Sequence, residues 1–321
     1  MKRRDFVMLL GSTAVAWPFV ARSQQAKLPT AGVLVLGTPP PEAFFRGLRD
    51  ALGIAGYIEG RSIRLEFRNA EGKADLLAEQ AAELVRLKVD IIVAYQTPAA
   101  TAAKRATSEI PIVMALAADP VGTGLIPNYA LPGGNITGTA AGSTEVAGKT
   151  VELIREVLPS AQRFAVLVNE TDPFAKPFLA AVGIGASNTG LEIKPIVMRP
   201  AEPLDAAFES MVAKGVSAVI MQGSMVSKES VDLAMKHRLP AFGIGRELPA
   251  TGGLMGYFAN AGELYRGTAV YIDKVLKGAK PAELPVSFPT KFELVINVRA
   301  AKALAISIPA TVLARADEVI E

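Results

Sequence analysis

Apolar residues in this 321-residue chain fall into two kinds of segment that alternate along its length. Short runs such as 31–36 (AGVLVL) and 163–168 (RFAVLV) are almost wholly apolar, a pattern typical of buried parallel strands. Longer segments such as 42–55 and 263–276 repeat apolar residues every three or four positions, which indicates amphipathic helices. The expected strands are 31–36, 62–67, 89–94, 111–116, 136–139, 163–168, 191–197, 218–221, 241–244, 253–256 and 294–297. The expected helices are 42–55, 74–87, 99–107, 148–157, 173–187, 204–213, 228–236, 263–276 and a last one from residue 300.

The order of these segments predicts the architecture. A strand–helix rhythm runs through the first half and restarts after residue 148, so we expect an α/β protein of two Rossmann-like lobes, each a parallel sheet covered by helices. Small residues at 140–143 suit a hinge, and the segment 278–289, which contains Gly and Pro, suits another crossing between the lobes. Ligands of open α/β sheets bind beyond the carboxyl ends of the strands, so a small solute is expected in a cleft between the two lobes.

The N-terminal segment has the composition of an export signal peptide. Residues 1–4 are basic, residues 6–21 are largely apolar, and Ala21-Arg22-Ser23 is a small-x-small cleavage pattern. We therefore expect residues 1–23 to be removed, with cleavage near Ser23-Gln24, and the protein to reside in the periplasm. Arg3-Arg4 before Phe6 resembles a twin-arginine signal, but the general secretory route and an uncleaved anchor are alternatives.

Charge and composition narrow the chemistry. The first 23 residues carry a formal charge of +3, which is the value for the whole chain, so the remainder is close to neutral and does not predict nucleic-acid binding. The chain has no cysteine, which excludes disulfides, thiolate metal sites and a lipid-modified cysteine. The only histidine, His237, lies at the end of an expected helix, so we expect no metal, no cofactor and no histidine-based catalytic triad.

A series of motifs in the mature chain resembles one known family. The segments, in order, are 118–122 (ADPVG), 131–138 (LPGGNITG), 252–257 (GGLMGY), 263–267 (ELYRG), 273–281 (DKVLKGAKP), 284–286 (LPV) and 289–297 (PTKFELVIN). They are similar to the ABC-transporter substrate-binding proteins that include tryptophan/tyrosine-type binding proteins. The resemblance covers nearly the whole mature chain, and it is specific for the family but not for the ligand.

The resemblance implies a type I periplasmic-binding-protein fold, in which three segments cross between two lobes. On that plan one lobe comprises 28–140 and 258–285, and the other comprises 141–257 and 286–321. The implied function is that of a receptor that captures a small solute by hinge closure and delivers it to an ABC permease in the inner membrane.

Candidate ligand contacts in the first lobe lie where expected strands end. Thr38 follows the first strand, and Tyr95-Gln96-Thr97 follows the third. Thr97 is expected either to cap the next helix or to place backbone N–H groups against a ligand carboxylate, and Tyr95 could stack on a planar solute. Asp119, in the 118–122 motif, could bind the ligand or only initiate a turn.

Candidate contacts in the second lobe follow the same logic. Asn169 and Asp172 come after strand 163–168, and Asp172 could receive a ligand ammonium or cap the following helix, which is the favoured role. Gln222 and Gly223 come after strand 218–221, where amino-acid receptors of this fold often have an acid, so a neutral Gln222 weakens the prediction of an amino-acid ligand. Tyr257 lies near an expected crossing and could face the cleft.

Arg246 follows the strand expected at 241–244. It could clamp a ligand carboxylate, but a surface ion pair with Glu247 is the favoured interpretation.

Three classes of function compete at this point. The first is the receptor just described, acting as a monomer on a solute that is aromatic or amino-acid-like. The alternative is a periplasmic ligand-sensing protein that presents its solute to a sensor kinase or chemoreceptor. An enzyme is not expected, because the chain has no G-x-S-x-G elbow, P-loop, H-E-x-x-H or G-x-G-x-x-G after a strand.

Overall fold

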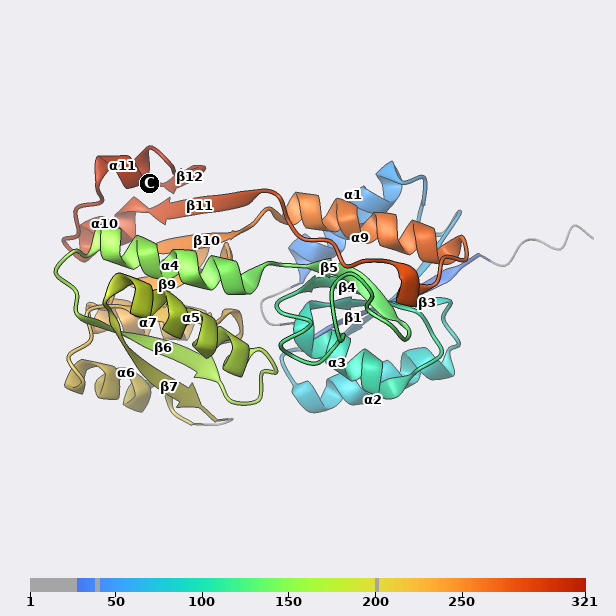
Figure 1. Ribbon diagram of the computed structural model, residues 1–321, viewed down its shortest axis with the longest axis horizontal. Helices are drawn as coiled ribbons and strands as arrows, with labels where there is room; N and C mark the ends of the chain where they lie inside the picture. The colour runs from blue at the N-terminus through green and yellow to red at the C-terminus, as the bar shows by residue number, and fades with distance from the viewer. Residues whose placement is uncertain (1–27, 38–40, 200–201) are drawn as a thin grey trace, which may run out of the picture.

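The computed structural model describes residues 28–37, 41–199 and 202–321. The predicted signal peptide, with its cleavage site, and Thr38 lie outside these residues. Within them the strands form two sheets that lie in separate lobes, side by side along the long axis of the molecule (Figure 1).

The first sheet has the order β2-β1-β3-β4-β5 and is parallel throughout. Its strands are β1 (Thr30–Val35), β2 (Arg64–Asn69), β3 (Ile91–Tyr95), β4 (Ile112–Ala117) and β5 (Ile136–Ala140). Helices α2 (Ala74–Arg86) and α3 (Gln96–Ala106) pack on one face, and α1 (Glu42–Ile54) and α9 (Ala261–Leu276) pack on the other. Because both faces are covered, strands such as β1 and β3 are apolar almost throughout, as the sequence pattern predicts.

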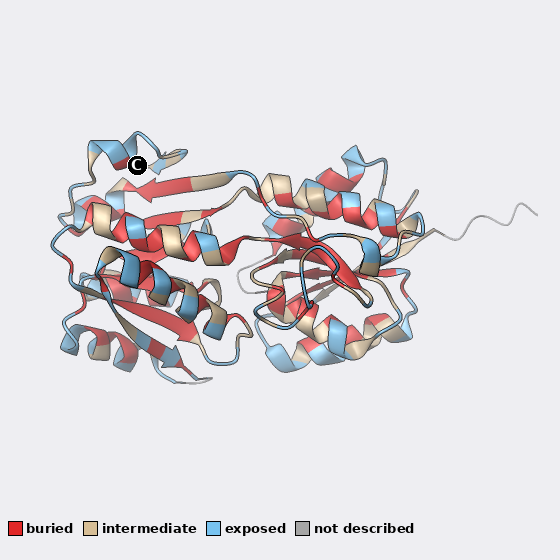
Figure 2. Cartoon of the chain, in the orientation of Figure 1, coloured by how far each residue is buried: buried red, intermediate tan, exposed pale blue. Residues whose placement is uncertain are grey.

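The second sheet has the order β12-β11-β10-β9-β8-β6-β7. Its strands are β6 (Arg163–Asn169), β7 (Glu192–Met198), β8 (Val219–Met221), β9 (Ala241–Gly243), β10 (Met255–Ala259), β11 (Phe292–Asn297) and β12 (Glu318–Ile320). One face packs on α4 (Ser143–Val157), α5 (Ala175–Thr189), α10 (Val298–Ala303) and α11 (Ala310–Leu313), and the other on α6 (Leu204–Ala213), α7 (Lys228–Lys236) and α8 (Glu247–Thr251). Short 3-10 turns, η1 (Gly223–Met225) and η2 (Pro281–Glu283), complete the described elements. Figure 2 shows the buried strands between exposed helix faces.

Local chemistry explains where several helices begin. The Asn260 side chain accepts a hydrogen bond of 2.8 Å from the Glu263 N–H, which caps α9. Ser227 and Ser230 form a reciprocal capping box at the start of α7. Asn297 accepts from the Ala300 N–H at 3.0 Å and caps the start of α10.

The second sheet differs from the expectation of purely parallel strands. Strand β11 runs antiparallel to β10, although the other pairs in this sheet are parallel. Strand β10 runs toward the other lobe, and β11 enters from that lobe, so the two must run in opposite directions. The short elements α8, α11 and β12 were not predicted, because segments of three to five residues carry too little periodicity to be recognised.

Three segments connect the lobes, and they lie beside one another (Figure 1). The first links β5 to α4, the second links β10 to α9, and the third runs from η2 into β11. Backbone hydrogen bonds join the third crossing to each of the other two: Ala140 N–H donates to the Ser287 carbonyl at 2.9 Å, and Asn260 N–H donates to the Lys291 carbonyl at 2.9 Å. The Glu263 carboxylate also accepts bonds from Thr290 and Lys291, so the start of α9 is tied to the third crossing.

Two further observations bear on the class of protein. Among the described residues, no helix combines the length and the apolar character needed to span a bilayer. The same residues contain no group of three or more His, Cys, Asp or Glu side chains arranged to hold a metal ion.

Candidate ligand-binding site

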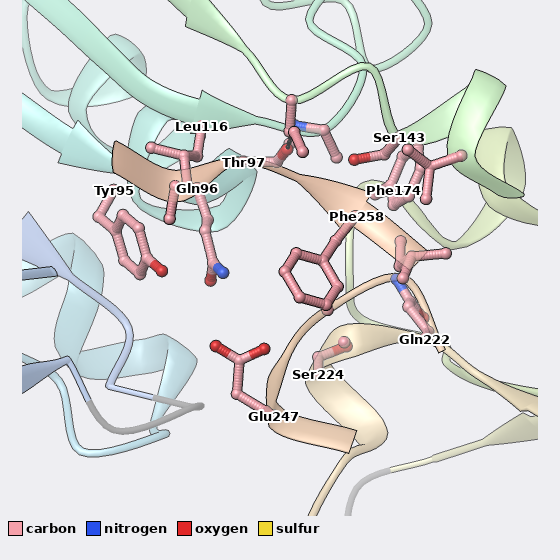
Figure 3. Close-up of a pocket in the computed structure, with 18 of the residues that line it drawn as sticks. Tyr95, Gln96, Thr97, Leu116, Ser143, Phe174, Gln222, Ser224, Glu247 and Phe258 are labelled. Carbon is pink, nitrogen blue, oxygen red and sulfur yellow. Dashed lines mark hydrogen bonds between the residues drawn. The ribbon is translucent and has the colours of Figure 1, made fainter. Parts of the chain in front are cut away.

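A cavity lies between the two lobes, beyond the carboxyl ends of strands from both sheets, and residues of both lobes line it (Figure 3). Its volume is about 170 Å³. The strand order reverses between β1 and β3 in one sheet and between β6 and β8 in the other, and the loops after these four strands include lining residues. Such switch points are the usual ligand sites of open α/β sheets. The loops after the strands of both halves therefore meet in one cleft, as the sequence predicts.

Tyr95, the last residue of β3, forms part of the wall in the first lobe. Its ring stacks on Phe44 of α1 with ring centres 4.0 Å apart, which holds the side chain in place. Burial raises the pKa of Tyr95 well above its ordinary value, and the nearby Tyr265 hydroxyl and Glu247 carboxylate act in the same direction. Burial, and then Glu247, raise the pKa of Tyr265 to about 12. Both hydroxyls thus remain protonated at neutral pH and can donate hydrogen bonds.

Two residues of this wall have backbone angles that non-glycine residues rarely adopt. Gln96, at the start of α3, has φ of 65°, and Leu116, at the end of β4, has φ of 59°. Such conformations cost about 1–3 kcal/mol and are concentrated at ligand clamps and active sites. At Gln96 the conformation directs the amide into the cavity, as Figure 3 shows.

Thr97 lies inside the first turn of α3 and is not its N-cap, so the prediction that it caps this helix is wrong. Its side-chain oxygen accepts a hydrogen bond of 3.0 Å from the Ala118 N–H, which ties the start of α3 to the end of β4. The residue is 1% exposed and lines the cavity. The hydroxyl proton is therefore left to point toward a ligand.

Asp172 lies in the turn between β6 and α5 and forms part of the wall in the second lobe. Its carboxylate accepts from the Phe174 N–H at 2.9 Å and from the Ser224 hydroxyl at 2.7 Å. Burial raises the pKa of Asp172, and these two hydrogen bonds oppose that rise. Asp172 therefore stabilises the turn before α5 and lines the cavity, but the prediction that it caps this helix is wrong, because the N-cap is Phe174 and no side chain caps the helix.

Gln222 and Gly223 follow β8 and line the same wall. The Gln222 side chain is 1% exposed, and its Oε1 accepts a hydrogen bond of 3.0 Å from the Asn169 N–H. Its Nε2 has no hydrogen-bond partner among the described residues. Buried amide nitrogens without an acceptor are uncommon in folded proteins.

Glu247, the first residue of α8, adds an acid that the sequence analysis did not place in the cleft. Figure 3 shows its carboxylate pointing toward Gln96 and Tyr95 of the opposite lobe. The predicted ion pair between Arg246 and Glu247 is wrong, because Arg246 pairs with Glu318 at 2.6 Å. Within the described part of the chain, the Glu247 carboxylate has no hydrogen bond or ion pair, and it is exposed at the cavity mouth.

Three other predicted contacts do not line this cavity. Asp119 accepts from the Gly122 N–H at 2.8 Å and from the Tyr129 hydroxyl at 2.9 Å, so it stabilises a turn. The Asn169 side chain accepts from the Thr171 N–H at 3.0 Å, within its own turn. Its backbone N–H donates to Gln222 and so positions that residue. Tyr257 stacks on Phe292 within the sheet, with ring centres 5.8 Å apart, while its neighbour Phe258 lines the cavity.

Several lining residues were not predicted from the sequence, and for Phe258 no local signal exists. Phe258 alternates with Tyr257 along β10, and only the direction of the sheet decides which of the two faces the cleft. Phe174 and Ser224 belong to loops that the sequence did place at strand ends, so they could have been included. Glu247 could have been found from its position four residues beyond β9, since that places it at the same edge of the sheet.

Comparisons with known proteins agree with this geometry. A family profile described as "ABC transporter substrate binding protein" matches residues 33–320. A tyrosine-binding protein of Clostridioides difficile is 29% identical over 271 residues, which cover 81% of this chain and 75% of that protein.

Solved structures extend the comparison to three dimensions. The ABC domain in complex with L-Trp from Streptococcus pneumoniae is 28% identical, with a TM-score of 0.85 over 91% of this chain and 100% of that one. A leucine-binding protein from Thermotoga maritima is 14% identical, with a TM-score of 0.56 over 80% of this chain and 78% of that one, so it shares the fold alone. The fold is that of type I periplasmic binding proteins, and the chain belongs to the ABC transporter substrate-binding protein family.

Proposed function

We propose that this chain is an exported receptor that captures an aromatic, amino-acid-like solute and delivers it to an ABC permease in the inner membrane. The observation that carries the proposal is a cavity lined by strand ends of both lobes. Two of its similar proteins are described by the aromatic amino acids they bind, tyrosine in one and L-Trp in the other. The family is described as binding a transporter substrate, and in this proposal the solute is captured without chemical change.

The charges of the cavity suit the two ends of a zwitterion. Glu247 lines the cavity, has no hydrogen bond or ion pair with any residue that the structure describes, and would receive the solute ammonium. Across the cleft, α3 begins at Gln96. The backbone N–H groups at the N-terminus of this helix, together with the Thr97 hydroxyl, would hold the solute carboxylate. The neutral Gln222 therefore does not argue against an amino acid, since a different residue supplies the acid.

Aromatic side chains supply the apolar part of the site. Tyr95, Phe174 and Phe258 line the cavity and would pack on the ring of the solute. Of the residues predicted as contacts, we propose that those lining the cavity touch the solute: Tyr95, Gln96, Thr97, Asp172, Gln222 and Gly223. We propose that Asp119, Asn169 and Tyr257 do not touch the solute and affect its binding only by stabilising the fold.

Because the head group would be held from opposite lobes, binding would draw the lobes together by hinge closure. We propose that 28–140 with 258–285 move as one body and 141–257 with 286–321 as the other. The protein would act in the periplasm as a monomer after cleavage near Ser23-Gln24.

A ligand screen on the chain that begins at Gln24 tests this function. Thermal unfolding is followed with L-tyrosine, L-tryptophan, L-phenylalanine, benzoate, 4-hydroxybenzoate and L-leucine. Ligand at about 100 times its Kd adds about 2.7 kcal/mol to the stability of the native state, which raises the melting temperature. If none of the aromatic amino acids raises the melting temperature, the proposal is contradicted. Conversion of a bound solute into a product would also contradict it.

A further inference from the structure

The amide of Gln222 has a fixed orientation in the wall of the second lobe. The Asn169 N–H can only donate, so the atom 3.0 Å away must be the Gln222 carbonyl oxygen Oε1. The other end of the amide is therefore the NH2 group. Figure 3 shows this side chain on the side of the cavity where Phe258 and Ser224 lie.

That NH2 group is buried without a partner. Gln222 is 1% exposed, and Nε2 has no acceptor within the described part of the chain. A buried donor without an acceptor destabilises the protein, and an acceptor brought to it would compensate for that cost. Because Gln222 lines the cavity, an acceptor atom on the solute can do so.

The surroundings restrict what that acceptor can be. Ser224, two residues beyond Gln222, donates to the carboxylate of Asp172 at 2.7 Å, so an acid lies in the same wall. A solute carboxylate at this end would face Asp172 and be repelled. Phe174 and Phe258 line the cavity here, and they favour a neutral oxygen carried on a ring over a charged group.

We propose that Gln222 is a specificity-determining residue whose Nε2 donates a hydrogen bond to an oxygen on the side chain of the solute. This inference rests on the proposed function, with the zwitterionic head group held between Glu247 and the start of α3. It predicts a preference for rings that carry a hydroxyl over rings without one, because a site built to pair with an oxygen leaves its donor unpaired when the oxygen is missing.

The test compares L-tyrosine with L-phenylalanine, which differ by the phenol oxygen alone. Calorimetric titration should give an affinity about tenfold higher for L-tyrosine in the unmodified protein. Gln222→Met keeps the length of the side chain and removes both the Nε2 donor and the Oε1 acceptor of the Asn169 N–H, and the second loss should affect both ligands equally. It should lower the affinity for L-tyrosine about tenfold and leave that for L-phenylalanine unchanged within about twofold.

Gln80→Met is the matched control, because Gln80 lies on α2 and its amide donates to the Asn69 carbonyl, outside this cavity. It should keep the preference for L-tyrosine. Equal loss of both ligands in Gln222→Met would mean that Gln222 only supports the fold, and equal binding of both ligands by the unmodified protein would mean that no oxygen is recognised. Either result overturns the inference but not the proposed function, whereas failure to bind any aromatic amino acid overturns both.

Discussion

At the residue scale, two acids in one cavity occupy opposite environments. Glu247 is exposed at the mouth and lacks a partner among the described residues, whereas Asp172 is largely buried and both of its oxygens accept hydrogen bonds. An exposed acid without internal partners contributes little to folding and is free for a ligand. Burial disfavours the charged form of an acid, and hydrogen bonds to its carboxylate oppose that effect. The two residues should therefore respond differently to neutralisation.

Glu247→Gln should weaken binding of an aromatic amino acid about tenfold or more, because the solute ammonium loses its charged partner. The melting temperature of the ligand-free protein should stay close to its original value. Calorimetric titration and thermal unfolding measure the two effects. Glu229→Gln, an exposed acid in the first turn of α7, is the control and should change neither. Full affinity in Glu247→Gln would exclude this residue from the ammonium site.

Asp172→Asn should leave the ligand-free protein as stable at neutral pH or make it more stable. Burial raises the pKa of Asp172 above its ordinary value, so the folded state binds its proton more tightly than the unfolded state does. The stabilisation from this residue is thus fully present below that value and is lost as the pH rises through the raised pKa. The advantage of the variant should shrink when thermal unfolding is repeated from about pH 7 to about pH 4. An advantage that grows toward low pH would show that the sign is wrong.

At the scale of elements, close backbone approach limits where side chains fit. Gly138 in β5 has φ of 135°, and a Cβ atom there would lie 2.2 Å from the Met114 carbonyl oxygen. The register of β5 against β4 shifts between Met114 and Ala117, next to Leu116 in the cavity wall. Gly138 thus permits the irregular strand pairing that shapes the site.

A pair of glycine substitutions separates this steric requirement from helix propensity. Gly138→Ala should destabilise the protein by about 1–3 kcal/mol, because the new methyl group collides with backbone that cannot move away. Gly148→Ala in α4 should stabilise it by about 0.5–1 kcal/mol, since nothing lies within 4 Å of the added Cβ atom and alanine favours helix. Melting temperatures of the two variants should move in opposite directions; a shift of the same sign in both would refute the steric argument.

Many elements follow from the sequence because their causes are local. Helices α6 and α7 begin and end at the residues that the pattern predicts, and most strands do so within two residues. Strand β11 is different. Its apolar run predicts a strand. Its antiparallel pairing depends on the third crossing, which is far from β10 in the sequence and comes beside it only when the lobes assemble.

At the scale of the whole molecule, one cavity is shared by two lobes joined through three adjacent crossings. A solute held from both sides favours the closed arrangement of the lobes over the open one. The equilibrium shifts by the difference between the free energies with which the solute binds the two arrangements. Closure is therefore expected to depend on contacts from both lobes.

Small-angle X-ray scattering should detect this closure. Saturating aromatic amino acid should lower the radius of gyration of the chain that begins at Gln24, because the lobes approach each other. Glu247→Gln at the same ligand concentration should show a smaller decrease. That chain contains no tryptophan, since Trp17 is the only one in the sequence, so fluorescence of added L-tryptophan reports the ligand itself. A radius that stays constant at full occupancy would exclude hinge closure.

The sequence by itself determined the two α/β lobes and the strand ends that bear Tyr95 to Thr97 and Gln222, because hydrophobic periodicity and turn chemistry act over a few residues. Only the tertiary structure decided which side chains meet. It brought Glu247 to face Gln96 from the other lobe, and it turned Asp119 and Tyr257 away from the cavity. Those outcomes depend on how segments far apart in the chain pack and pair, and no local pattern records that geometry.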